Sequence, residues 1–123
     1  MRHAIPALVL LATTLVGAQG RLAPPPFVTC DRNELTSYTG RVTSLRREKQ
    51  STRLVIETDE ATTERVVIAH PDGDLLSAFH LRGQPFTEAD MARLMPGGRL
   101  VKDARATVWV CTRGMRPQVD WSF

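Results

Sequence analysis

The chain has 123 residues, of which 42% are hydrophobic and 24% charged, and its formal net charge is +3 at pH 7. This length accommodates one small domain. The positive charge is weak and dispersed, so the composition does not support a nucleic-acid partner, which would require a clustered basic stripe.

Residues 1–18 have the three parts of a secretory signal peptide: a positive start, an apolar stretch and a small-residue exit. Val16 and Ala18 occupy the positions where signal peptidase requires small side chains, so we expect cleavage after Ala18. A retained membrane helix is less favoured, because spanning a bilayer takes about 20 apolar residues and Pro6 interrupts this shorter run. The sequence therefore predicts a periplasmic or secreted protein with no membrane span after cleavage.

Residues 19–37 include three consecutive prolines and are expected to form an extended lead-in to the domain. The two cysteines of the chain are Cys30 and Cys111. An even number of cysteines in a small exported domain favours a disulfide over two buried free thiols, the alternative. Two cysteines without a nearby histidine do not supply the four ligands of a zinc site, and no cofactor is expected.

The pattern of residues 38–123 becomes strand-like from Gly40 onward. The first strand, residues 41–46, alternates imperfectly, which indicates a bulge. The next two strands, residues 53–58 and 64–70, alternate regularly and are joined by a short polar loop typical of a hairpin.

A turn-forming segment, residues 70–74, is expected to end the third strand. Residues 75–86 leave two alternatives open. They form either a helical turn capped by Asp74 or the approach to a short strand that runs through Leu81.

A short helix is predicted over residues 87–95, with Thr87 as its N-cap and Pro96 after its end. Phe86 and Met91 have the spacing of a hydrophobic staple. A long strand then runs from Arg99 or Ala104 to Cys111, and a last strand includes Val119, Trp121 and Phe123.

Three strands, one short helix and two further strands, spanning roughly residues 38–123, resemble the order of the oligonucleotide/oligosaccharide-binding (OB) fold. The resemblance implies a five-stranded barrel whose open end is plugged by the helix, and a bulge in its first strand. An SH3-like barrel and an open α+β sheet are the alternatives. The resemblance concerns the fold alone and involves no diagnostic motif.

The aromatic residues are candidates for stacking on a ligand: Tyr38, Phe79, Trp109 and Trp121. Trp109 shares a strand face with Arg105, Thr107 and Cys111, opposite a face of alanines and valines. If the alanine and valine face is the core, Trp109 is exposed unless the disulfide covers it. The competing interpretation, which is favoured for the aromatic residues as a group, is that Trp109 and Trp121 fill the core. If one of them contributes to a binding surface, we expect it to be Trp109, with Arg105 and Thr107 beside it.

A weaker candidate is an oxygen and nitrogen metal site made by His70, Asp72, Asp74 and His80. The competing interpretation is that the aspartates form a turn and a cap while the histidines bind local backbone groups. This second interpretation is favoured, because the spacing alone does not bring four ligands together.

The sequence contains no nucleophile motif such as Gly-x-Ser-x-Gly and no Cys-x-x-Cys pair. We therefore expect a small, non-catalytic binding module that recognises a protein or a small polar ligand. The alternatives are a metal-assisted hydrolase and a partner or inhibitor of an exported enzyme.

Overall fold

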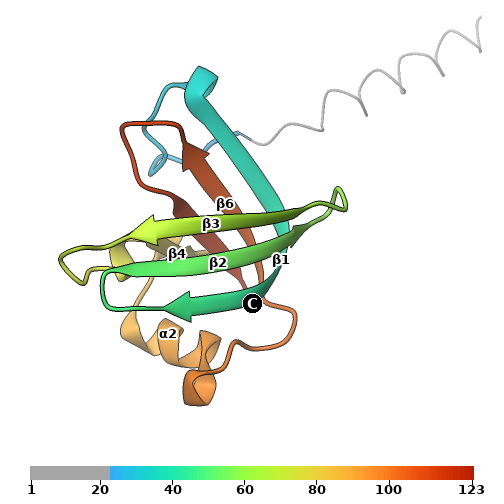
Figure 1. The fold of residues 1–123 in the computed structure, drawn as a ribbon, viewed down its shortest axis with the longest axis vertical. Helices are drawn as coiled ribbons and strands as arrows, with labels where there is room; N and C mark the ends of the chain where they lie inside the picture. Colours follow the sequence, from blue (N-terminus) through green and yellow to red (C-terminus); the bar gives the residue numbers. More distant parts are fainter. Residues whose placement is uncertain (1–22) are drawn as a thin grey trace, which may run out of the picture.

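The computed structural model describes residues 23–123, so the predicted signal peptide lies outside the described residues. The fold is mainly β, with seven strands in one unclosed mixed sheet of order β3-β2-β1-β6-β7-β4-β5 (Figure 1). The strands are β1 (Leu35–Arg47), β2 (Ser51–Thr58), β3 (Thr63–Ala69), β4 (Phe79–Leu81), β5 (Gln84–Pro85), β6 (Arg105–Cys111) and β7 (Gln118–Ser122). The described residues also form one α-helix and three 3-10 turns, which are α2 (Glu88–Leu94), η1 (Arg32–Glu34), η2 (Leu76–Ala78) and η3 (Pro96–Gly98).

The prediction of a mainly β domain with one short helix is confirmed, but a closed five-stranded barrel is not. The difference lies in residues 75–86, where both open alternatives occur in succession: the η2 turn leads into β4. β4 pairs in parallel with β7 and antiparallel with β5, while β3 has no partner on its other side among residues 23–123. The sheet therefore ends at two edges, β3 and β5.

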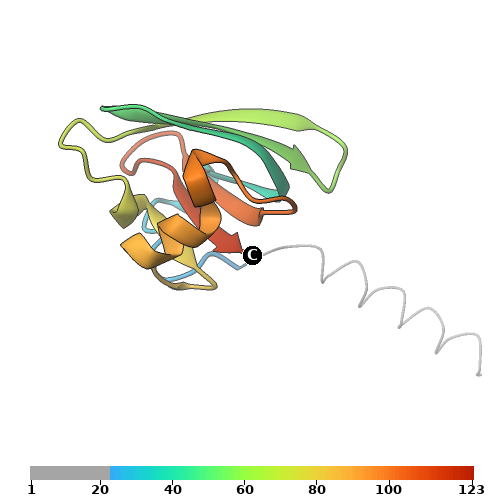
Figure 2. The ribbon, with the colours of Figure 1, turned by 90° about the horizontal axis from the view of Figure 1, so that it is seen from below.

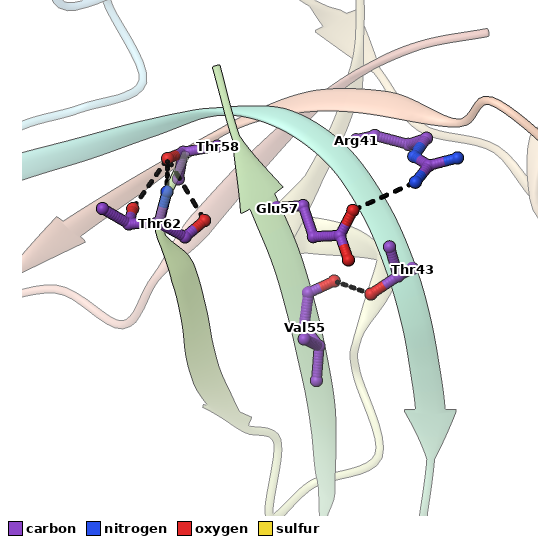
Figure 3. Close-up of polar contacts among 6 residues, drawn as sticks. All are labelled: Arg41, Thr43, Val55, Glu57, Thr58 and Thr62. Atoms are coloured by element: carbon purple, nitrogen blue, oxygen red, sulfur yellow. Dashed lines mark hydrogen bonds and ion pairs between the residues drawn. The ribbon is translucent and has the colours of Figure 1, made fainter. Parts of the chain in front are cut away.

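The long strand β1 joins the two halves of the sheet. Its first half pairs with β6 and its second half with β2, and Figure 1 shows how strongly it bends between them. The predicted bulge is present, because the register with β2 shifts between Val42 and Ser44. Thr43, the extra residue, donates its hydroxyl to the Val55 carbonyl at 3.5 Å (Figure 3).

At the bend, the backbones of β1 and β2 approach closely at Gly40. A Cβ atom placed on Gly40 would lie 2.1 Å from the Glu57 carbonyl oxygen and 2.7 Å from the Thr58 Cα. Only glycine fits such a contact, and a glycine inside a strand often marks a close backbone approach. The bend that shapes the sheet therefore depends on this residue.

The hairpin of β2 and β3 has the predicted alternation. Thr52, Leu54, Ile56 and Thr58 are buried on β2, and Val66 and Ile68 are buried on β3. The turn is fastened by the Thr58 hydroxyl, which lies 2.7 Å from the Thr62 hydroxyl and accepts the Thr62 backbone N–H (Figure 3). In Figure 2 this hairpin forms the upper layer of the fold, and α2 lies below it.

Helix α2 begins as predicted at the Thr87 N-cap. The Thr87 hydroxyl accepts the Asp90 N–H while the Asp90 carboxylate accepts the Thr87 N–H, so the two residues form a capping box. Phe86 and Met91, the predicted staple pair, are both buried. A helix of two turns is not stable alone, and α2 gains its stability by packing Met91 and Leu94 into the core.

The core lies between the concave face of the sheet and α2. Its largest fully buried side chains are Trp121, Phe79, Leu54, Ile56, Ile68, Leu75 and Leu94. Phe79 packs edge to face against both Phe86 and Trp121, with ring centroids 5.4 Å apart in each pair. This geometry is favourable for aromatic pairs, so residues from β4, β7 and the start of α2 are held as one unit.

The opposite face of β6 and β7 is covered by the N-terminal segment, residues 23–30. Cys30 and Cys111 lie with their sulfur atoms 2.08 Å apart, at disulfide-bonding distance, which agrees with the predicted pairing. Phe27 stacks on His80 of β4, with ring centroids 3.6 Å apart. The lead-in is therefore part of the folded domain, and β1 begins at Leu35, slightly before the predicted boundary at residue 38.

None of the helices in residues 23–123 is both long enough and apolar enough to cross a membrane.

Candidate functional site

The predicted exposure of Trp109 is wrong. Its side chain is only 5% exposed, although it lies on the face opposite the alanines and valines as the alternation indicated. The reason is that both faces of β6 are covered. Cys111, on the same face, is bonded to Cys30, and Gln118, opposite Trp109 on β7, is buried and bound to His80. Trp109 therefore belongs to a second, smaller buried layer and offers no surface to a ligand.

Arg105 and Thr107, the two residues predicted beside Trp109, line a shallow pocket of about 160 Å³. Arg105 donates to the Asp59 carboxylate at 2.6 Å, which raises the pKa of the guanidinium. The Thr107 hydroxyl is 3.0 Å from the Thr39 hydroxyl. Asp120, also in this pocket, accepts the Gly83 N–H at 2.8 Å. These polar groups are satisfied within the fold, so the pocket does not present groups that await a ligand.

The four residues of the metal hypothesis separate into two places. His70 is buried at the end of β3, where its Nε2 lies 2.8 Å from the Thr52 hydroxyl. His80 lies on β4, bound through Nε2 to Gln118 at 3.1 Å. Within residues 23–123, no three His, Cys, Asp or Glu side chains are grouped so as to hold a metal ion.

The two aspartates of that hypothesis organise the turn after β3. Asp72 accepts the Asp74 N–H at 3.1 Å, and Asp74 accepts the Ser77 N–H at 3.2 Å. Hydrogen bonds from Ser77 lower the pKa of Asp74, and the nearby guanidinium of Arg116 lowers it further. These bonds agree with the expected turn role of the two aspartates. The expectation for the histidines is wrong, because their Nε2 atoms lie beside the side chains of Thr52 and Gln118 and not beside backbone groups.

A different group of residues stands out on the convex side of the sheet. We define the basic face as the outward residues Arg46 of β1, Arg53 and Val55 of β2, and Arg65 and Val67 of β3. Figure 2 shows this side of the three strands turned away from α2 and from the rest of the molecule. Val67, 57% exposed, is the one strongly exposed large hydrophobic residue among those the structure describes.

Strand register arranges the basic face in two adjacent rows. Arg46 lies opposite Arg53, which lies opposite Val67; Ser44 lies opposite Val55, which lies opposite Arg65. The three arginines therefore surround a small apolar centre of Val55 and Val67. Within residues 23–123, their guanidinium groups form no ion pair, whereas Arg41, another arginine of β1, is paired with Glu57 at 3.0 Å (Figure 3).

The direct Arg46–Arg53 pairing is unfavourable for the fold. Like charges placed opposite one another on neighbouring strands destabilise a sheet by tenths of a kcal/mol, up to about 1 kcal/mol. No carboxylate of the described residues offsets this repulsion by an ion pair with either arginine. A local conflict between sequence and fold of this kind is expected at functional positions.

A groove of about 660 Å³ adjoins the basic face, between the end of β1 and α2. Both apolar and charged side chains line it. It is lined by Ser44, Leu45, Arg46, Arg47, Glu88, Met91, Ala92, Met95 and Gly98. Methionines adapt to irregular partners, and Met91 and Met95 line this groove together with Arg46.

The basic face was not found from the sequence, although one signal for it was available. Arg46, Arg53 and Arg65 each stand at an outward position of an alternating strand, and hairpin pairing places such positions side by side. In the sequence these residues are far enough apart to look dispersed. They become a cluster only once the register of both hairpins is known.

Comparison of the chain with family models, with curated proteins and with solved structures finds no match.

Proposed function

We propose that this chain is a small, exported, non-catalytic binding module that recognises an anionic partner through the basic face. The observation that carries the proposal is the cluster of Arg46, Arg53 and Arg65 without ion pairs around the exposed Val67. Arginines donate paired hydrogen bonds to carboxylates and phosphates. An apolar centre with a charged surround is also the common anatomy of protein-binding surfaces.

The non-catalytic part of the proposal is supported by what the candidate reactive groups do. His70 is bound to Thr52, His80 is bound to Gln118 and stacked on Phe27, and the aspartates near His70 hold a turn. Each group has a role in stability. The Thr52 hydroxyl and His70 do lie at the distance of a nucleophile and its base, but both side chains are fully buried, so a substrate does not reach them.

Export is supported by the signal-peptide pattern of residues 1–18 and by the Cys30–Cys111 pair, which is compatible with an oxidising compartment. The finer fold proposal is an OB-like barrel that is open along one seam. The three strands β1 to β3 and the helix α2 followed by β6 and β7 support it, with β4 and β5 as additional short strands between β3 and α2. Arg116 bridges the seam by donating to the Ala69 carbonyl at 3.0 Å and to the Ser77 hydroxyl.

The proposal is tested by titrating the folded protein with poly-L-glutamate, a carboxylate polyanion, at several salt concentrations. We expect salt-dependent binding that weakens at least about tenfold in the triple variant R46Q/R53Q/R65Q, because three charge-assisted contacts are lost.

The matched control is R32Q/R99Q/K102Q, which removes the same charge from exposed positions outside the basic face. This control should bind as the wild type does, apart from a small effect of net charge. Equal weakening in both triple variants would show that only the overall charge matters, and would overturn the proposal.

A further inference from the structure

The free edge of β3 lies directly beside the basic face. Two hydrogen bonds fix how this strand pairs with β2: Thr58 N–H donates to the Thr62 carbonyl and His70 N–H to the Gln50 carbonyl, each at 2.8 Å. In an antiparallel ladder such bonded pairs recur at every second residue. The even-numbered residues of β3 therefore bond to β2, and the odd-numbered ones direct their N–H and C=O groups away from it.

The outward backbone groups belong to Thr63, Arg65, Val67 and Ala69. Only the Ala69 carbonyl has a partner among the described residues, the guanidinium of Arg116. The open stretch thus runs from Thr63 to Val67, and all three odd-numbered residues within it are exposed. It contains no proline, and a row of unpaired backbone groups of this kind is a template for another strand.

We propose that this edge accepts an extended acidic polypeptide segment as an additional strand, with its carboxylates on the basic face. The inference rests on the proposed function and names its partner. An added strand would lie about 4.8 Å from β3, so its outward side chains would be next to Arg65 and Val67 and within reach of Arg53. Backbone pairing would supply affinity, and the arginines would select acidic side chains at alternate positions.

Charge favours a separate acidic segment over two other occupants. A second copy of the chain, paired edge to edge, would bring two basic faces together, and like charges on neighbouring strands repel. Residues 1–22 of the chain contain no acidic residue. The one acid of β3, Glu64, has Ile56 as its cross-strand partner and lies on the opposite side of the sheet from the arginines.

The test uses an eight-residue capped peptide of alternating glutamate and valine, with amide hydrogen exchange of the folded protein read by NMR. Saturation with the peptide should slow exchange at the Arg65 and Val67 amides by at least about tenfold, because strand pairing protects amides that were open. The Val66 and Ile68 amides, already bonded to β2, should change little. The same peptide with lysine in place of glutamate should not bind.

Two variants sharpen this test. Methylating alternate peptide nitrogens removes pairing without changing charge, so the methylated peptide should bind at least about tenfold more weakly. On the protein, Val67→Pro removes an outward donor that β2 does not use, a position where a strand tolerates proline, and it should also abolish protection. If this variant fails to fold, the methylated peptide still decides the question.

The outcomes separate the inference from the proposed function. If the glutamate peptide and its methylated form both bind in an arginine-dependent way, without protection of the Arg65 and Val67 amides, the added strand is overturned and the binding role of the basic face remains. Loss of all anion binding would overturn both. Protection of these amides by self-association in the absence of peptide would assign the edge to a second copy of the chain and overturn the acidic segment. Single-stranded DNA that binds more tightly than the glutamate peptide, without protecting these amides, would also overturn the acidic segment.

Discussion

At the scale of single residues, the polar groups of the interior are few and specific. Thr52 is fully buried, and its hydroxyl lies 2.8 Å from Nε2 of the buried His70, while Nδ1 of His70 has no partner among the described residues. The contact with Thr52 is therefore the one hydrogen bond that the His70 ring makes among the described residues. A buried group deprived of its partner pays its full desolvation penalty.

Thr52→Val keeps the shape of the side chain and removes the hydroxyl. We expect a loss of about 1–3 kcal/mol in the free energy of unfolding, because His70 would then be buried without a hydrogen bond. Thr52→Ser, which keeps the hydroxyl and loses one methyl group, should lose about 0.8 kcal/mol. Urea unfolding measures both. A valine variant as stable as the serine variant would show that the hydrogen bond contributes nothing.

For Trp109, the strand face could be predicted from the sequence, but the burial of the side chain could not. Its place on the face opposite Val108 was correctly predicted from alternation. Its burial was not, because the cover over this face begins some 80 residues earlier and is fixed by the bond between Cys30 and Cys111, at a sequence separation of 81. Local periodicity contains no information about contacts made by such distant segments.

At the scale of elements, local chemistry gave the more reliable predictions. The helix start at Thr87, the bulge in the first strand and the alternating hairpin of residues 53–70 depend on nearest neighbours, and all three are present. The two-residue strand β5 and the parallel partner of β4 could not be predicted. The parallel pairing depends on how β7 returns beside residues 79–81, and β5 is only a two-residue partner of β4.

Gly40→Ala adds only one methyl group, but it should destabilise the bend of β1 strongly. The added methyl group would lie 2.1 Å from the Glu57 carbonyl oxygen, so the two strands would have to separate. We expect a loss of about 1–3 kcal/mol or more in urea unfolding, typical of overpacking. Ser44→Ala, an exposed change on the same strand, serves as the control and should be nearly neutral. An alanine at residue 40 that is equally neutral would contradict the close approach.

The capping box of α2 predicts a response to acid. The hydrogen bond from the Thr87 N–H, with help from Arg93, holds the pKa of Asp90 below its ordinary value of 3.8. The folded state therefore binds this proton less readily than the unfolded state. The carboxylate's contribution to stability is present above pH 3.8 and is lost as the pH falls through the lower, folded pKa.

Asp90→Asn should flatten part of this acid response. Urea midpoints measured at intervals from about pH 6 down to pH 2 should fall less steeply in the variant than in the wild type. Some dependence should remain, because Ser77 lowers the pKa of Asp74 in the same direction. Identical slopes in the two proteins would contradict the role given to Asp90.

At the scale of the whole molecule, the Cys30–Cys111 pair connects the N-terminal cover to β6. Reduction should lower the free energy of unfolding by roughly 4 kcal/mol on the chain-entropy model, because it releases a long loop in the unfolded state. It should also expose Trp109, whose fluorescence would shift to the red. The C30S/C111S variant should resemble the reduced protein and ignore reductant. Unchanged stability on reduction would contradict the linkage.

The central claim is that the arginines of the basic face are held together by a binding role and not by the needs of the fold. The measurement that tests it most directly is urea unfolding with and without saturating poly-L-glutamate. A ligand that binds only the folded state raises the unfolding midpoint. We predict a clear rise for the wild type and a much smaller one for R46Q/R53Q/R65Q, whose stability without ligand should equal or exceed the wild type because the Arg46–Arg53 repulsion is removed. An equal rise in both proteins, or none in the wild type, would contradict the account.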